Sequence, residues 1–170
     1  MTTPTTIAGG NNIRINLWFD TQAEAAAQFY TQVFKESAIK HTSYYGNGGQ
    51  GSSDKSAAAV MSVTFTLQGQ EFMVLNGGPN FTFNEAISFV IPCDTQEEVD
   101  YYWEQLSAYP SAEQCGWLKD KFGVSWQVIP RMFSQLLTGA DAEKSQRAMK
   151  AMRQMKKLDI AALQQAYEGE

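Results

Sequence analysis

The chain has 170 residues, the size of a single domain, and 44% of them are hydrophobic, which is enough for one core and too many for a disordered chain. Thirteen Lys and Arg against eighteen Asp and Glu give a net charge of −5. That sign disfavours a broad nucleic-acid or anionic-membrane surface, because both depend on positive charge. Neither a bilayer-spanning apolar stretch nor a signal peptide is present, so we expect a soluble cytoplasmic protein with no membrane partner and a flexible N-terminus over residues 1–12.

Few side chains suited to metal binding or covalent catalysis are available. Cys93 and Cys115 are the two cysteines and have no CxxC spacing, which excludes a disulfide framework and a zinc site of that type. His41 is the one histidine, so a site built on several imidazoles is excluded. Either thiol could act as a nucleophile with His41, but a free cysteine is most often simply buried. We expect neither a metal nor a cofactor.

A short repeat organises the first 130 residues. The pattern D-T-Q-x-E begins at Asp20 and again at Asp94. Each copy follows an apolar run typical of a strand, over residues 13–19 and 87–91. Each copy also contains an S/T-x-x-E capping box, starting at Thr21 and Thr95, that predicts a helix start. The best interpretation is an internal duplication.

Further strands follow each predicted helix. Alternating patterns predict strands at 39–45, 60–67 and 71–75 in the first half, and at 114–118 and 122–129 in the second. Each half is therefore predicted as β-α-β-β-β, and the pattern is weakest around 109–113. Beyond Pro130 the pattern predicts three helices, at 131–138, 142–157 and 160–167, with caps at Asp141 and Asp159.

Several motifs resemble one protein family. They are Leu17-Trp18-Phe19-Asp20, Glu24-Ala25-Ala26 with Phe29-Tyr30, the segment 83–89, the segment 99–103 and the long run from Cys115 to Pro130. Together they resemble the PhnB-like, or demethylubiquinone-methyltransferase-like, branch of the vicinal-oxygen-chelate superfamily, which includes glyoxalase I, bleomycin-resistance proteins and extradiol dioxygenases.

The resemblance implies an α+β fold. Two tandem β-α-β-β-β modules, at 13–76 and 85–130, would form a cupped mixed sheet around a central cleft in a single domain spanning 13–130. Residues 131–170 would be a helical extension of the same domain. The family also implies a homodimer.

Metal-dependent members of the superfamily hold one divalent ion with four side chains. The corresponding positions here fall near Ile15, Val74, Ser88 and Gln127. Divalent ions prefer carboxylate or imidazole ligands, and this set supplies none. The resemblance therefore carries over the fold and not the metal site.

A conventional methyltransferase site is also not indicated. Residues 46–51 fit G-x-G-x-x-G, but a dinucleotide-type site needs a helix directly after the glycines, and here a serine-rich tract and a strand follow. We interpret residues 46–56 as an inter-strand loop. No other glycine-rich turn leads from a strand into a helix, as S-adenosylmethionine binding would require.

Strand alternation suggests which side chains line the cleft. Val124, Trp126 and Val128 share one face of their strand, and Ser125 and Gln127 share the other, which by family topology faces the cleft. The same reasoning on neighbouring strands completes a mostly apolar set with a few polar groups, typical of a small-molecule site. The expected ligand-binding residues are Phe72, Val74, Asn76, Ser88, Ser125 and Gln127.

A basic stretch near the C-terminus has a simpler interpretation. Six of the thirteen basic residues lie between 144 and 157, without the interleaved aromatics that base stacking needs. We interpret them as a solvated helix face and expect no nucleic-acid partner. They are Lys144, Arg147, Lys150, Arg153, Lys156 and Lys157.

The leading hypothesis is a binder of a small organic molecule in a metal-free cleft. One alternative is an enzyme of the glyoxalase/dioxygenase superfamily, of the metal-dependent lyase or isomerase type, in which Gln127 and Ser88 could polarise an oxygen. The other is a structural homodimer with a filled cleft.

Overall fold

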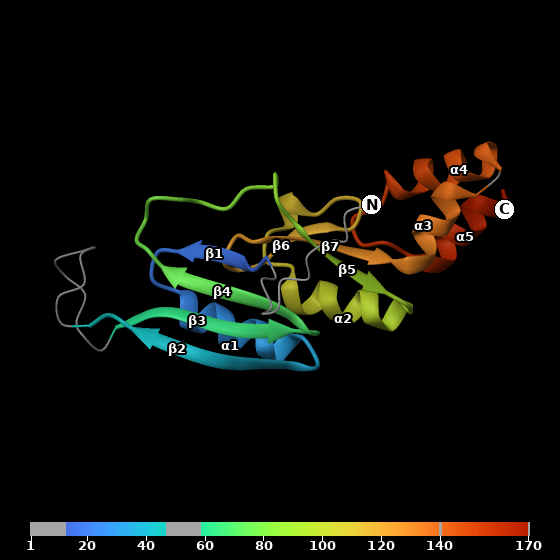
Figure 1. Ribbon diagram of the computed structural model, residues 1–170. Helices are drawn as coiled ribbons and strands as arrows, with labels where there is room; N and C mark the ends of the chain where they lie inside the picture. Colours follow the sequence, from blue (N-terminus) through green and yellow to red (C-terminus); the bar gives the residue numbers. More distant parts are fainter. Residues whose placement is uncertain (1–12, 47–58, 140, 170) are drawn as a thin grey trace, which may run out of the picture. The chain divides into compact units, whose positions relative to one another are not determined.

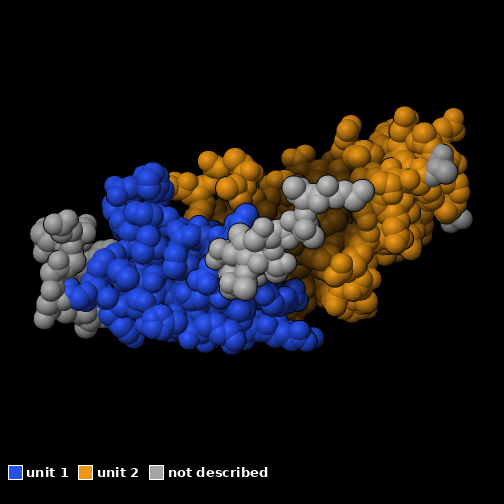
Figure 2. Space-filling view, in the orientation of Figure 1, with its two compact units in different colours: residues 1–81 blue, residues 82–170 orange. Residues whose placement is uncertain are grey.

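Residues 13–46, 59–139 and 141–169 are described by a computed structural model. The chain divides into two units, residues 1–81 and 82–170, shown in separate colours in Figure 2. The α+β class is confirmed, since each unit contains a mixed sheet and helices (Figure 1). The predicted flexible segment 1–12, and the loop 46–56 beyond Gly46, lie outside the described residues.

The first unit has the predicted β-α-β-β-β order. Its elements are β1 (Ile15–Phe19), α1 (Ala23–Val33), β2 (Ser37–Tyr44), β3 (Val60–Leu67) and β4 (Gln70–Asn76). The strands form sheet 1 in the order β1-β4-β3-β2, in which β1 runs parallel to β4 and the other pairs are antiparallel. The tight β3–β4 turn uses Gln68 and Gly69, both at positive φ, which suits the twist of a two-residue hairpin.

The core of this unit lies between α1 and sheet 1. The alanine-rich stripe of α1 is buried as predicted and brings the helix close to the strands. Tyr30 of α1 stacks on Phe65 of β3, with ring centroids 6.2 Å apart, and Phe65 stacks on Phe72 of β4 at 5.5 Å. The side of β4 that carries Phe72 therefore faces the helix.

The start of α1 differs from the prediction. Its N-cap is Gln22, which makes no side-chain capping bond, so the capping box predicted at Thr21 is wrong. Instead, Asn76 at the end of β4 accepts a hydrogen bond from the Ala23 N–H through Oδ1, at 2.8 Å. A tertiary contact thus satisfies one of the N–H groups that a helix start leaves without a helical partner.

The second unit repeats this plan. Its elements are β5 (Phe89–Cys93), α2 (Gln96–Leu106), a 3-10 turn η1 (Pro110–Ala112), β6 (Trp117–Lys119) and β7 (Ser125–Pro130). They form sheet 2 in the order β5-β7-β6, with β5 parallel to β7. Here the predicted cap at Thr95 is confirmed, because its hydroxyl accepts from the Glu98 N–H, while the Glu98 carboxylate accepts from the N–H of Asp94, one residue before the cap.

Within the described residues, sheet 2 has one strand fewer than sheet 1. By pairing, β5, β7 and β6 correspond to β1, β4 and β3, which leaves no counterpart of β2. The 3-10 turn at Pro110 occupies that part of the sequence, and only Gln114 makes an isolated bridge, to Trp117. A proline has no N–H to donate to a neighbouring strand, which disfavours pairing at Pro110.

Residues after Pro130 form α3 (Arg131–Thr138), α4 (Ala142–Met152) and α5 (Ile160–Glu168), and the predicted caps at Asp141 and Asp159 are confirmed. Phe133, Leu158 and Leu163 are buried together, and Ile129 of β7 packs against them. No helix in the described part of the chain is both long and apolar enough to cross a membrane.

The predicted helix 142–157 ends early, at Met152. The chain beyond α4 binds the segment that leads into β6. The carbonyls of Met155 and Lys156 accept hydrogen bonds from the N–H groups of Cys115 and Gly116, both at 2.8 Å. Continued helix would direct these carbonyls along its own axis, so the docking requires the helix to stop.

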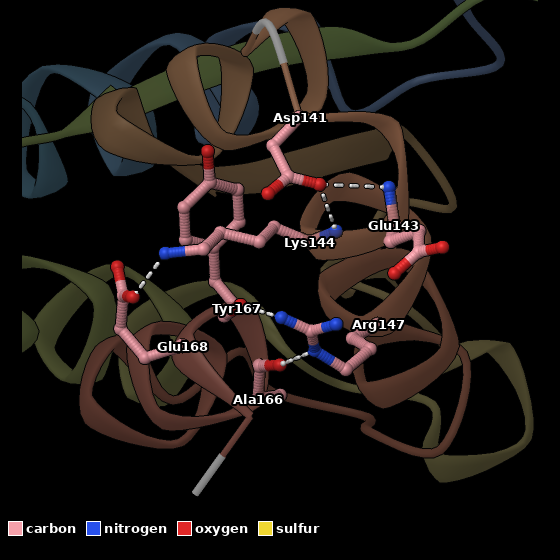
Figure 3. Close-up of polar contacts among 7 residues, drawn as sticks. All are labelled: Asp141, Glu143, Lys144, Arg147, Ala166, Tyr167 and Glu168. Atoms are coloured by element: carbon pink, nitrogen blue, oxygen red, sulfur yellow. Dashed lines mark hydrogen bonds and ion pairs between the residues drawn. The ribbon is translucent and has the colours of Figure 1, made fainter.

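A polar cluster joins α4 to α5 (Figure 3). Arg147 donates to the carbonyls of Ala166 and Tyr167, at 3.2 and 2.8 Å, and so satisfies the end of α5. Lys144 pairs with Glu168 and lies 5.4 Å from the centroid of the Tyr167 ring. Lys156 and Lys157 pair with Glu113 and Asp100. Four of the six basic residues thus contact other parts of the same unit.

The buried carboxylate of Asp120 holds the turn between β6 and β7. Its Oδ1 accepts from the N–H groups of Phe122 and Val124, at 2.9 and 3.1 Å, and its Oδ2 accepts from Trp126 Nε1 at 2.8 Å. The side chain is 0% exposed. Three charge-assisted hydrogen bonds compensate for burying it.

We expect Asp120→Asn to lower the free energy of unfolding by about 1–3 kcal/mol. An asparagine that keeps the two Oδ1 hydrogen bonds places its amide N–H groups against the Trp126 N–H, so two donors face each other and one hydrogen bond is lost. Asp159→Asn is the matched control, since asparagine caps a helix as well as aspartate does, and should change stability by less than about 0.5 kcal/mol. Urea unfolding of both variants measures the difference, and equal effects would contradict the assigned role of Asp120.

We expect Arg147→Met to destabilise the protein by about 1–3 kcal/mol, because two carbonyls at the end of α5 lose a charged donor. Lys144→Met removes the same charge from the same helix but breaks only a partly exposed ion pair and ring contact, so we expect a smaller loss of stability. Urea unfolding should rank Arg147→Met as the more costly change, and the reverse order would refute the capping role.

Candidate functional site

The two faces of sheet 2 differ in chemistry. One face packs under α2 and is apolar, with Ile91, Leu118, Trp126 and Val128 all buried. The opposite side, which we call the distal face, carries Ser125 and Gln127 of β7. Alternation along β7 therefore places these two residues as the sequence predicted.

Gln127 connects the distal face to Ser88. Its Nε2 donates to Ser88 Oγ at 2.8 Å, so the structure brings together two of the predicted ligand-binding residues. In the strand register Gln127 lies opposite Val90 of β5 on one side and Trp117 of β6 on the other. Val90 is 56% exposed. The amide thus lies between an aliphatic and an aromatic neighbour.

Ser125 is the distal-face residue with an unmet hydrogen-bonding requirement. It is only 2% exposed, and its Oγ has no hydrogen-bond partner among the described residues. Leaving a buried hydroxyl unpaired costs about 1–3 kcal/mol, so nearly all such groups in folded proteins have partners. A hydroxyl of this kind on a face that carries other polar groups suggests a place for a ligand atom.

The neighbour of Ser125 across the hairpin is Lys119 of β6. Directly opposed residues project to the same face, with Cβ atoms about 4.5–5.5 Å apart. Lys119 Nζ lies 2.5 Å from Glu85 Oε1, and the lysine side chain is 24% exposed while the glutamate is 62% exposed. The hydrogen bond from Lys119 is the main cause that lowers the pKa of Glu85.

The structure corrects the expected face of the β4 residues. Phe72 and Val74 face α1 and are buried in the core of the first unit, and Asn76 joins them there as a 6%-exposed residue. The Asn76 amide binds backbone on both sides, accepting from Ala23 and donating from Nδ2 to the Val60 carbonyl at 3.0 Å. Its predicted place on the cleft face is wrong, as are those of Phe72 and Val74.

The other face of sheet 1 is marked by Trp18. It lies between the buried residues Leu17 and Phe19 and so projects away from α1. Its ring lies against the backbone of Gly77, where an added Cβ would be 2.0 Å from the ring, and its Nε1 donates to the Gly78 carbonyl at 2.9 Å.

A metal site is not supported by the described residues. In ranges 13–46, 59–139 and 141–169, no three His, Cys, Asp or Glu side chains gather where they could hold an ion. Of the four positions aligned with superfamily metal ligands, Val74 lies in the core, while Gln127 and Ser88 bond to each other.

Burial makes Cys93 a poor candidate for a nucleophile. Burial, followed by the nearby Glu98 and Asp94 carboxylates, raises the pKa of Cys93 to about 12. Its thiol is therefore protonated at neutral pH and unsuited to nucleophilic attack. His41 lies on β2 of the other unit, where it is exposed.

Sequence reasoning missed Lys119 and Glu85 as site residues, although both lie in segments that carried the family resemblance. The signal was the turn at 120–124: once that turn is assigned to a hairpin, Lys119 and Ser125 must face each other across it.

Comparison with known proteins identifies the family. The model of the 3-demethylubiquinone-9 3-methyltransferase family matches residues 11–129. A solved PhnB protein from Bacillus cereus, which carries the same methyltransferase name, is 39% identical; the match covers 68% of this chain and 95% of that one, with a TM-score of 0.55. The chain belongs to this PhnB-like family.

A second solved structure supports the fold alone. Protein PA1353 from Pseudomonas aeruginosa is 18% identical to this PhnB-like chain over 70% of it and 96% of the other chain, with a TM-score of 0.54. No curated protein matches. The family match stops at residue 129, so the helices α3, α4 and α5 of this PhnB-like protein lie beyond it.

We expect Asn76→Ala to lower the free energy of unfolding by about 1–3 kcal/mol, because it removes both the contact at the start of α1 and the bond to Val60. Asn16→Ala, at an exposed position on β1, should change stability by less than about 0.5 kcal/mol. Thermal and urea unfolding measure both. An unchanged stability in Asn76→Ala would contradict the structural role assigned to this amide.

Proposed function

We propose that this PhnB-like protein binds a small organic molecule on the distal face of sheet 2, without a metal ion. The observation that carries the proposal is the buried, unpaired hydroxyl of Ser125. A ligand atom that accepts from it would remove the cost of its burial.

The neighbouring side chains suit such a ligand. Small-molecule sites are mostly apolar with a few well-placed polar groups. Gln127 and Ser88 supply an amide and a hydroxyl 2.8 Å apart, and Val90 and Trp117 supply apolar surface beside them. The superfamily to which the sequence is similar also places its ligands against residues of this strand, which supports the same choice.

The activity in the family's name is not part of this proposal. Where β1 leads into α1 and where β5 leads into α2, the turns contain Asp20-Thr21-Gln22 and Asp94-Thr95. Neither turn has the glycines with which a strand-to-helix turn holds a nucleotide-type cofactor, and each has an acidic residue there.

Ser125→Ala gives a test with opposite effects on stability and binding. We expect it to raise the free energy of unfolding by about 1 kcal/mol, because it removes an unpaired buried hydroxyl. We expect the same variant, and Gln127→Ala, to weaken binding of the small aromatic and aliphatic compounds that a fragment screen of the wild type selects. Chemical denaturation measures the first effect, and NMR of the protein amide signals measures the second.

Gln164→Ala, on the exposed side of α5, is the control and should leave both quantities unchanged. A screen in which no compound perturbs the amide signals of Ser88 and Gln127 would contradict the proposal and favour a structural dimer with a filled cleft. Near-stoichiometric metal, retained after incubation with Zn²⁺, Ni²⁺, Mn²⁺ or Fe²⁺ and lost in Gln127→Ala, would also contradict it and favour a metal-assisted enzyme.

A further inference from the structure

We propose that the ligand is an organic carboxylate, and that its anionic group replaces Glu85 as the partner of Lys119. This inference rests on the proposed function, since it assigns a chemical class to the molecule bound on the distal face. The observation behind it is a row of polar groups across sheet 2, in which Lys119 lies directly opposite Ser125.

Lys119 is the fixed member of its ion pair. It is on β6, in a hairpin whose turn is held by the buried Asp120 carboxylate, and its side chain is three-quarters buried. A cation that is largely removed from water requires an anionic partner close by. Some carboxylate must therefore stay near Nζ whenever the protein is folded.

Glu85 is the exchangeable member. It precedes β5 in a segment without regular structure, and its side chain is 62% exposed. An exposed carboxylate is easily hydrated, so Glu85 can move into water at a small cost when another anion takes its place beside Lys119. A glutamate is ordinarily ionised at neutral pH, and the hydrogen bond from Lys119 lowers the pKa of Glu85 further, so it occupies the position as an anion.

Glu85 is also an incomplete partner for this row. It contacts Lys119 but leaves the hydroxyl of Ser125 without an acceptor among the described residues. A carboxylate has two oxygens, so one bound between these side chains can accept from Nζ with one oxygen and from Oγ with the other. A ligand acid therefore satisfies both donors, whereas Glu85 satisfies one.

The rest of the distal face indicates the body of the ligand. Gln127 lies two residues beyond Ser125 on β7, between Val90 of β5 and Trp117 of β6. Apolar surface on both sides of a single amide suits a short aromatic or branched aliphatic group. The overall charge of −5 gives no general attraction for anions, so binding of an acid would have to come from this local row.

The experiment compares 3-phenylpropionate with its uncharged amide, 3-phenylpropanamide, which differ little except in charge. Both are titrated into the full-length protein and followed by amide chemical shifts in NMR. We expect the wild type to bind the acid more tightly than the amide. Glu85→Gln should tighten acid binding about fivefold, because the competing carboxylate is gone, and leave amide binding unchanged.

Lys119→Met should abolish the preference for the acid, and Lys119→Arg, which keeps the charge, should retain most of it. Glu168→Gln is the matched control: it removes a carboxylate from the Lys144 pair elsewhere in the same unit and should affect neither probe. Raising the salt concentration should weaken binding of the acid and leave binding of the amide unchanged.

The outcomes separate this inference from the proposed function. If acid and amide shift the Ser88 and Gln127 signals with equal affinity, or if Glu85→Gln leaves the ratio of their affinities unchanged, the carboxylate assignment is overturned while the binding site stands. If neither probe shifts these signals in the wild type or in Glu85→Gln, the binding site itself is contradicted.

Discussion

The hairpin between β6 and β7 depends on one buried carboxylate, and the candidate site depends on that hairpin. Asp120 gathers two backbone N–H groups and an indole N–H, which fixes the turn and with it the register of the two strands. A slip of one residue would move every side chain of β6 to the other face. Lys119 would then leave Ser125, and Leu118 would leave the core.

The same local problem, the start of a helix after a strand, is solved in two ways in this chain. At α2 the nearby residues Thr95 and Glu98 cap the helix. At α1 the equivalent sequence makes no such cap, and Asn76, far along the chain, bonds to Ala23 instead. The identity of a capping residue was therefore predictable where the partner is local and not where it comes from a distant strand.

A similar difference explains which strand faces could be predicted. In β7 polar and apolar residues alternate, so Ser125 and Gln127 were assigned to the correct face. In β4 the run Phe72-Met-Val-Leu75 is apolar on both sides, and alternation cannot decide which side meets the helix. The packing of Tyr30 and Phe65 decides it, and those contacts join residues that the sequence keeps apart. The β-α-β-β-β order of the first unit and the three C-terminal helices follow from periodicity and local caps, whereas the same order predicted for the second unit is wrong by one strand. The early end of α4 does not, because it results from hydrogen bonds to Cys115 and Gly116.

Those hydrogen bonds have a consequence for synthesis of the chain. All the strands and the helix of the first unit lie within residues 1–81, so their pairing partners have all been synthesised before β5 begins. The second unit still lacks partners when β7 has been synthesised, because the Cys115 and Gly116 amides bind the later carbonyls of Met155 and Lys156, and Ile129 packs against Leu158 and Leu163. Until residues 155–163 have been synthesised, sheet 2 has polar and apolar groups without their final partners. During this interval a nascent chain of this protein most needs protection from aggregation.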